Sequence, residues 1–229
     1  MGGAIALARL GFSSPGLQRC SPQLMVALPD RLSVADYLAL EAVSPTKHEY
    51  WDGYLVAMAG ASDSHVAIVG NLFAALLGHI APPCRIYMTD MRLKIANKNR
   101  YFYPDLLVTC DPRDTIITPE NNYAKQFPTL IVEVLSDTTE LRDRGSKFFD
   151  YQQIESLQEY ALINTSCQRV ECFRRNSEDD WVLTTYTPDR ADQFQLKSID
   201  FTGTLTQLYR NAIALPSSPA FDSDPPDRP

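Results

Sequence analysis

Apolar and polar positions alternate along the chain in a way that predicts several helices. The strongest signal covers residues 62–80, where apolar side chains recur with the i, i+3, i+4, i+7 spacing of one helix face. Pro82-Pro83 end this pattern, because proline cannot continue a helix. Weaker periodic stretches predict three shorter helices, at residues 33–43, 141–154 and 204–213.

Strands are expected between these helices. Asp52-Gly53, flanked by aromatic and β-branched residues, is the signal of a two-residue β-hairpin turn. Further alternating or continuous apolar runs predict strands over residues 85–95, 101–110, 130–135, 159–164, 168–174 and 181–187.

The order of these elements predicts an α/β or α+β domain with a mixed sheet flanked by helices. We expect this domain to cover residues 32–213. Residues 1–31 are read as an N-terminal extension, with Met25 as an alternative start, and residues 214–229 as a disordered tail rich in proline and aspartate. Residues 111–127 form a long polar loop of the kind that often borders a functional site.

The net charge of −7 gives no support to a broad, nonspecific grip on nucleic acid. Charge is distributed unevenly, however. Between Arg85 and Arg100 five basic residues are accompanied by one acidic residue, Asp90. This segment suits either a solvated strand face or a surface that contacts phosphates.

The cysteines and the hydropathy indicate where the protein works. Five cysteines with no CxxC pair favour a reducing compartment, and hence the cytoplasm, over a disulfide scaffold or a zinc site. No apolar run approaches the ~20 residues that span a bilayer, so we expect no membrane segment. The N-terminus has no basic region ahead of its apolar start, which argues against a secretory signal.

Two carboxylates interrupt strands that are otherwise apolar. Glu133 lies within the aliphatic run of residues 130–135, and Asp105 follows a proline directly before Leu-Leu-Val. An ionised carboxyl in a buried strand costs several kcal/mol unless something pairs with it. If the two strands are neighbours, both carboxylates reach one edge and could share a hard divalent cation. The alternative is that each pairs with an arginine or caps a turn.

Other residues could complete such a site. Lys147 begins the helix after the Glu133 strand, and Tyr151 shares its helix face at i+4. A lysine near a metal-bound water can orient that water and stabilise a developing oxyanion, although an ordinary surface lysine is the alternative. Further candidates, each with a structural alternative, are Glu49, His65 at the first turn of the long helix, and Asp90 as a spare ligand.

The motifs, taken together and in order, resemble a known family. They are Lys47-His-Glu-Tyr-Trp-Asp-Gly53, Met58-Ala-Gly-Ala-Ser62 with His65, Tyr103-Pro-Asp105, Ile131-Val-Glu-Val-Leu-Ser136, Lys147 and Ser156-Leu-Gln-Glu-Tyr160. The chain resembles the Uma-type family of proposed restriction endonucleases, within the PD-(D/E)XK nuclease superfamily, from about residue 32 to residue 209.

The resemblance implies a restriction-endonuclease-like fold and a metal-dependent DNA endonuclease. Asp105 matches the family's aspartate, Glu133 matches the acidic residue of its E-x-K element, and the main-chain carbonyl of Val134 would be a third ligand for Mg²⁺ or Mn²⁺. Leu135 stands where the lysine of that element is expected, so Lys147 would be a migrated lysine. Glu49 matches an acidic position ahead of the core.

The implied mechanism is hydrolysis of a DNA phosphodiester by a metal-bound water, with Lys147 assisting. Arg142, Arg144 and the basic segment of residues 85–100 could guide the DNA backbone. A homodimer would suit double-strand cleavage. Three alternatives stay open: a DNA- or protein-binding module on the nuclease fold, a hydrolase of small phosphoesters, and a structural protein in which Glu133 pairs with an arginine.

Overall fold

The structure is a computed structural model, in which residues 31–119 and 121–212 are described. Apart from residue 31, the two predicted extensions, 1–31 and 214–229, lie outside these residues. None of the described helices is long and apolar enough to cross a membrane. The helical segments are α1 (Val34–Val43), α2 (Asp63–Leu77), α3 (Pro112–Thr115), α4 (Glu140–Arg142), a π-helical turn (Asp143–Lys147), α5 (Phe148–Tyr151), a 3-10 turn (Lys197–Ile199) and α6 (Leu205–Leu208).

The central layer is a six-stranded mixed sheet in the order β11-β10-β9-β8-β6-β3. Its strands pair antiparallel except for the parallel pair β8–β9. In chain order they are β3 (Arg85–Met88), β6 (Leu106–Thr109), β8 (Leu130–Val134), β9 (Glu159–Ile163), β10 (Val170–Arg175) and β11 (Trp181–Tyr186).

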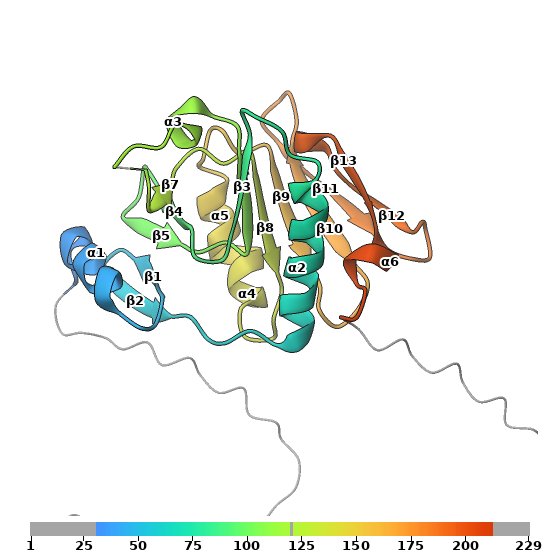
Figure 1. The fold of residues 1–229 in the computed structure, drawn as a ribbon. Coiled ribbons are helices and arrows are strands. Elements are labelled where there is room, and N and C mark those ends of the chain that lie inside the picture. The colour runs from blue at the N-terminus through green and yellow to red at the C-terminus, as the bar shows by residue number, and fades with distance from the viewer. Residues whose placement is uncertain (1–30, 120, 213–229) are drawn as a thin grey trace, which may run out of the picture.

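Two smaller sheets complete the strands of the described residues. The five-stranded sheet, in the order β2-β1-β5-β4-β7, lies with α1 on the left in Figure 1, and the two-stranded β12-β13 sheet lies on the right. Their strands are β1 (His48–Trp51), β2 (Tyr54–Ala57), β4 (Arg92–Ile95), β5 (Arg100–Phe102), β7 (Ala124–Lys125), β12 (Gln193–Leu196) and β13 (Phe201–Thr204).

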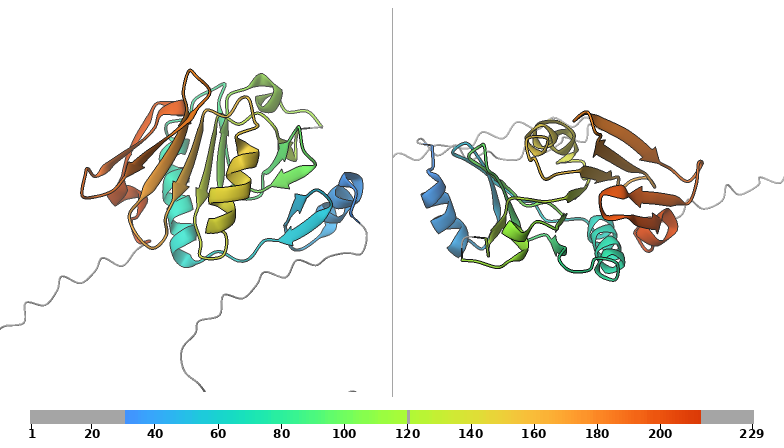
Figure 2. Two further views of the ribbon diagram at one scale, coloured as in Figure 1. Left: turned by 180° about the vertical axis from the view of Figure 1, so that it is seen from behind. Right: turned by 90° about the horizontal axis from the view of Figure 1, so that it is seen from above.

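Helices cover both faces of the six-stranded sheet. Figure 2 shows α2 on one face and α4 to α5 on the other. Successive side chains of β8 point to opposite faces of the sheet, so they join two different apolar cores. Even-numbered residues such as Val132 pack in the core beneath α2, whereas Ile131 packs in the core with Tyr151 of α5. Glu133 therefore points away from α2, toward α5 and the five-stranded sheet. The predicted α+β fold with a mixed sheet is confirmed.

Several local predictions are confirmed. Ser33 caps α1 by accepting a hydrogen bond from the Asp36 N–H, and Ser62 caps α2 in the same way through the His65 N–H. Asp52 and Gly53 both have positive φ, as the predicted hairpin turn requires. These signals are read correctly because each depends on residues that are close along the chain.

Two predicted strands are wrong, since each divides between two sheets. The predicted strand 85–95 becomes β3 and β4, separated by a turn in which Thr89 has φ 41°. The predicted strand 101–110 becomes β5 and β6, separated by Pro104, which cannot donate to a strand ladder. Hydrophobic periodicity continues across both breaks, so it does not reveal that the chain changes sheets.

Other predictions are corrected as well. Cys84 and Cys110 form a disulfide across the paired strands β3 and β6, although the cysteine pattern argued against disulfides. The predicted loop 111–127 contains the short elements α3 and β7. The hairpin of β12 and β13 was not predicted, and the predicted terminal helix is only the single turn α6. The disulfide therefore removes the support that cysteine usage lent to a cytoplasmic location.

Candidate functional site

Asp105 and Glu133 lie side by side on neighbouring strands. The β6–β8 register pairs Leu106 with Val132, and one further step places Asp105 opposite Glu133. The Asp105 N–H donates to Glu133 Oε2 at 3.4 Å, and the Val134 N–H donates to Asp105 Oδ2 at 2.7 Å. Pro104, directly before Asp105, has no N–H to donate to a strand ladder. The predicted adjacency of the two strands is confirmed.

The side chain of Lys147 reaches the buried Glu133 from the π-helical turn. Its Nζ lies 3.2 Å from Glu133 Oε1, 2.7 Å from Glu49 Oε1 and 3.1 Å from Asp143 Oδ1. All four side chains are at least 94% shielded from solvent. We call these residues the Glu133 cluster: Glu49, Glu133, Asp143 and Lys147.

Burial and the neighbouring charges shift the pKa values of two members of the Glu133 cluster, Glu133 and Lys147. Burial raises the pKa of Glu133 well above its usual range, Lys147 opposes that rise, and neighbouring carboxylates add to it. Burial acts to lower the pKa of Lys147, but Glu133 and the other carboxylates outweigh burial and raise it. The three carboxylates of the cluster outnumber the two cations that contact them, Lys147 and Arg142.

Two further predicted residues, Tyr151 and His65, contact the carboxylates of this site. The Tyr151 hydroxyl donates to Glu133 Oε1 at 2.8 Å. His65 Nε2 lies 2.9 Å from Asp105 Oδ1. Burial acts to lower the pKa of His65, but the hydrogen bond and charge of Asp105 raise it overall. Glu49 comes from β1, and its Oε2 also lies 3.4 Å from Arg142 Nη1.

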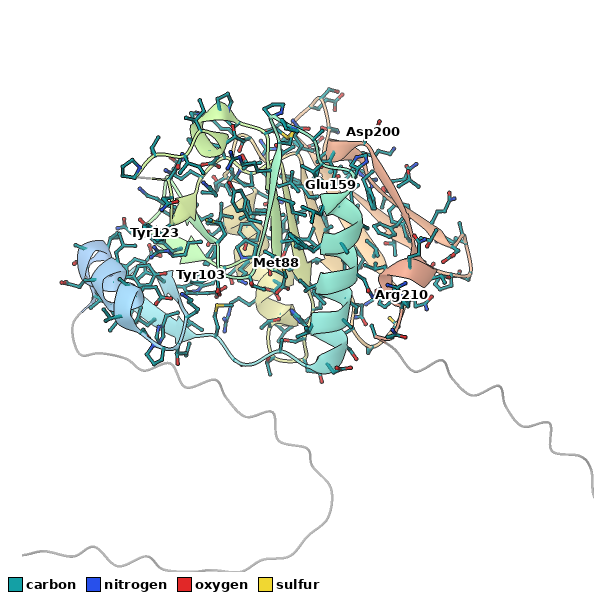
Figure 3. All side chains as sticks on the ribbon, in the orientation of Figure 1. Met88, Tyr103, Tyr123, Glu159, Asp200 and Arg210 are labelled. Carbon is teal, nitrogen blue, oxygen red and sulfur yellow. A yellow bond between two sulfur atoms is a disulfide. The ribbon has the colours of Figure 1, made fainter. Side chains whose placement is uncertain are left out.

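A cavity of about 510 Å³ opens onto these residues. All four members of the Glu133 cluster line it, together with Asp105 and His65. Met88 and Tyr103, which also line it, are labelled in Figure 3, between α2 and the five-stranded sheet. The carboxylates are thus accessible to a ligand even though each is nearly buried.

The predicted ligands at this cavity have oxygen donors, the kind that hard divalent cations prefer. Asp105, Glu133 and the Val134 carbonyl offer only oxygen, which suits Mg²⁺ or Mn²⁺ better than a softer metal. Within residues 31–119 and 121–212, no group of three or more His, Cys, Asp or Glu side chains is arranged to hold a metal. Two side-chain carboxylates with a carbonyl and waters remain within the coordination habits of Mg²⁺.

Comparison with known proteins assigns the chain to a family. The profile of the Uma2 family, described as "Putative restriction endonuclease", matches residues 34–205. The chain belongs to the Uma2 family. The resemblance predicted from the motifs is therefore confirmed.

Two similar relatives are uncharacterized proteins of Synechocystis sp. (strain ATCC 27184 / PCC 6803 / Kazusa). The protein slr1290 is 36% identical over 181 residues, covering 79% of this chain and 92% of its own. The protein sll1609 is 35% identical over 170 residues, covering 74% and 95%. A crystal structure of a "putative nuclease belonging to DUF820" from Anabaena variabilis ATCC 29413 superposes with a TM-score of 0.60 at 17% identity. That match covers 78% of this chain and 97% of the other, and it shows a shared fold.

Leu135, the departure from the E-x-K element, has a structural explanation in this Uma2 chain. Leu135 directly follows β8, and its side chain is buried in the apolar core with Tyr151. A lysine there would place its charge among apolar side chains. Lys147 approaches Glu133 from the π-helical turn, and such turns are frequent at functional sites.

Several predicted residues lie elsewhere. Asp90 is exposed on the β3–β4 turn and does not line the cavity. Arg144 pairs with Glu140 and Glu171, outside the cavity lining. In the basic segment of residues 85–100, Lys98 and Arg100 pair with the fully buried Asp150. Lys98, Arg100 and Arg144 are thus tied to structural partners.

Residues that the sequence did not single out also belong to the site. Asp143 contacts Lys147 and lines the cavity. It lies in a charged segment at the start of a helix, where one more acidic residue does not stand out in the sequence. Tyr103, a cavity residue, donates to the buried Glu41 at 2.8 Å. The His48 ring lies 3.1 Å from the same carboxylate.

Proposed function

We propose that this protein is a divalent-metal-dependent DNA nuclease. The observation that carries the proposal is the meeting of Asp105, Glu133 and Lys147 at one cavity, from strands and a turn that are far apart in sequence. Membership of a family described as restriction endonucleases supports it, and so does the shared fold with a protein described as a nuclease.

The proposed roles follow from the geometry. Asp105, Glu133 and the Val134 carbonyl would hold Mg²⁺ or Mn²⁺. When bound, the ion supplies an activated water and neutralises charge on the scissile phosphate. Glu49 and Asp143 hold Lys147 beside Glu133, so its ammonium group can stabilise the negative charge that develops on the phosphate.

Hydrogen bonds at the base of the cavity hold the carboxylates in place. His65 lies against one oxygen of Asp105, and the Val134 N–H binds the other. Tyr151 donates to the Glu133 oxygen that Lys147 also contacts. Carboxylates held in this way need little reorganisation before they bind a cation.

The test compares matched variants on labelled DNA. The full chain is incubated with Mg²⁺ or Mn²⁺, as are Asp105→Asn, Glu133→Gln and a control, Glu178→Gln, which neutralises an exposed acid outside the cavity. We expect cleavage by the wild type and the control, and a loss of roughly 10²–10³-fold in each site variant.

Cleavage by Glu133→Gln at the wild-type rate would contradict the proposal. Folding of each variant is checked by its far-UV circular dichroism. A parallel assay with nucleotides tests small phosphoesters, and turnover of nucleotides without turnover of DNA would replace the proposed substrate.

A further inference from the structure

The lining of the cavity contains two chemically different groups of residues. One group carries hydroxyls and charge and comes from the segment after β8, including Ser136, Thr138, Thr139 and Arg142. The other group, which we call the apolar wall, consists of the side chains Val56, Ala57, Met58, Val66, Val69 and Met88. A ligand bound in the cavity therefore has both polar and apolar groups to contact.

Three members of the apolar wall are exposed, although Val56 and Val69 are buried. Met58 and Met88 are each 37% exposed, and Val66 is 59% exposed. They come from three separate segments: the end of the β1–β2 hairpin, the first turns of α2, and the end of β3. Apolar side chains that gather from separate segments at the mouth of a cavity are typical of a binding surface.

Cations are scarce in the same cavity. Its described lining contains five carboxylates but only two permanently cationic side chains, Arg142 and Lys147. Both of these contact Glu49. A protein that grips duplex DNA mainly through its phosphates needs a row of lysines and arginines. This cavity lacks such a row, so phosphate contacts alone do not account for binding of a DNA strand.

We propose that the cavity binds one nucleotide of unpaired DNA, with its base or sugar against the apolar wall and its phosphate toward the carboxylates. The inference rests on the proposed nuclease function and specifies its substrate class. A base is able to contact Met58 and Met88 only when it is unstacked, because its faces are covered in a duplex. Apolar side chains, methionine included, contact bases exposed in this way.

The size of the cavity agrees with this substrate. A volume of about 510 Å³ falls within the ~300–1,000 Å³ range of small-molecule sites, which suits one nucleotide with a metal ion. A stacked duplex is too wide to enter, so it would have to release a nucleotide first at a cost of a few stacking interactions. Single strands and unpaired bubbles avoid that cost.

The test uses one labelled DNA strand in three forms: single, fully paired, and in a duplex with a central unpaired bubble. With Mn²⁺, we expect the single strand and the bubble to be cleaved at least about tenfold faster than the paired duplex.

The double variant Met58→Ala/Met88→Ala should raise KM for unpaired DNA by about tenfold while kcat changes little. Binding should also depend weakly on salt. A plot of the logarithm of the binding constant against the logarithm of salt concentration should have a slope of about −1.4 or shallower, because two phosphates or fewer are contacted.

The matched control is Val182→Ala/Leu183→Ala, which shortens two exposed apolar side chains on β11 outside the cavity lining. Equal or faster cleavage of paired duplex would overturn the inference and leave the nuclease function standing. An unchanged KM in the methionine variant, or an equal rise in the control, would overturn it too.

Fluorescence anisotropy with Ca²⁺ separates the inference from the function. If no DNA is cleaved, the nuclease proposal fails and binding alone decides the inference. Tighter binding of unpaired than paired DNA, weakened in the methionine variant, supports an unpaired-nucleotide site. Equal binding of the two forms overturns it.

Discussion

Two buried carboxylates of this protein meet their cations in different ways. Asp150 is fully buried and pairs with both Lys98 and Arg100, so one negative charge has two positive partners. In the Glu133 cluster, three carboxylates share Lys147. The Glu133 cluster opens onto the cavity, whereas Asp150 does not line it. We call the second group, Asp150 with Lys98 and Arg100, the Asp150 cluster.

This difference teaches that a buried carboxylate is not by itself the mark of a functional site. The Asp150 cluster holds enough positive charge to offset its carboxylate, as a structural ion pair must. The Glu133 cluster has an excess of negative charge and access to solvent, which is the arrangement that attracts a metal ion. Charge balance and access, rather than burial, distinguish the two.

The largest effect is expected on stability when the Asp150 cluster is broken. Asp150→Ala removes the buried partner of Lys98 and Arg100, of which Arg100 retains Asp52, and should reduce the free energy of unfolding by about 3 kcal/mol. Urea denaturation measures this loss. The rate of DNA cleavage per folded molecule should stay near that of the wild type, and a selective loss of rate would place Asp150 in the site.

A smaller effect, this time on catalysis, is expected for Lys147→Met. The variant keeps the length of the side chain but removes the ammonium group beside Glu133, so kcat should fall roughly 10²-fold. Single-turnover cleavage with saturating Mn²⁺ gives this number. The exposed Lys197→Met serves as the control. Full activity of the Lys147 variant would show that Lys147 is a structural counter-ion like those of Asp150.

The excess of carboxylates should also appear as stabilisation by metal. At a Mn²⁺ concentration 100 times Kd, a site present only in the folded state contributes about 2.7 kcal/mol. Thermal unfolding with and without Mn²⁺ should therefore show a rise in Tm for the wild type. The rise should be absent in Asp105→Asn and retained in Glu178→Gln. An equal rise in Asp105→Asn would place the bound metal elsewhere.

The smallest effect concerns the pH dependence of His65. Because the pKa of His65 is raised in the folded protein, its pairing with Asp105 stabilises the fold fully below the unfolded pKa of ~6.5. This contribution is lost as pH rises through the folded pKa. His65→Ala should therefore destabilise the protein more at pH 6 than at pH 9, as measured by urea denaturation. A difference that is constant with pH would contradict this ion pair.

Local signals along the chain were enough to predict much of the fold. Helices α1 and α2 carry their own caps and apolar faces, and the turn at Asp52-Gly53 carries its own backbone preference. The division of residues 85–95 and 101–110 between sheets could not be predicted in the same way. This division depends on which distant strands each segment pairs with, and hydrophobic periodicity does not indicate the pairing partner.

Part of the candidate site could also be predicted from the sequence. Glu133 stands out because one carboxylate interrupts a run of aliphatic residues, and Asp105 because it directly precedes another such run. Asp143 and Glu41 interrupt no such pattern, and they became part of the site and its support only through contacts with Lys147 and Tyr103. The apolar wall was hidden for a similar reason, since its members come from separate segments.

By itself, the sequence determined that Glu133 would be buried and would need a partner. Burial in an aliphatic strand is a local property, and the cost of an unpaired carboxylate follows directly from it. Only the tertiary structure decided which groups meet that carboxylate: Lys147 from a π-helical turn, Glu49 from another sheet, and Asp105 from the neighbouring strand. Electrostatic interactions depend on distance in space, and folding brings together residues that are 14 to 84 positions apart in the chain.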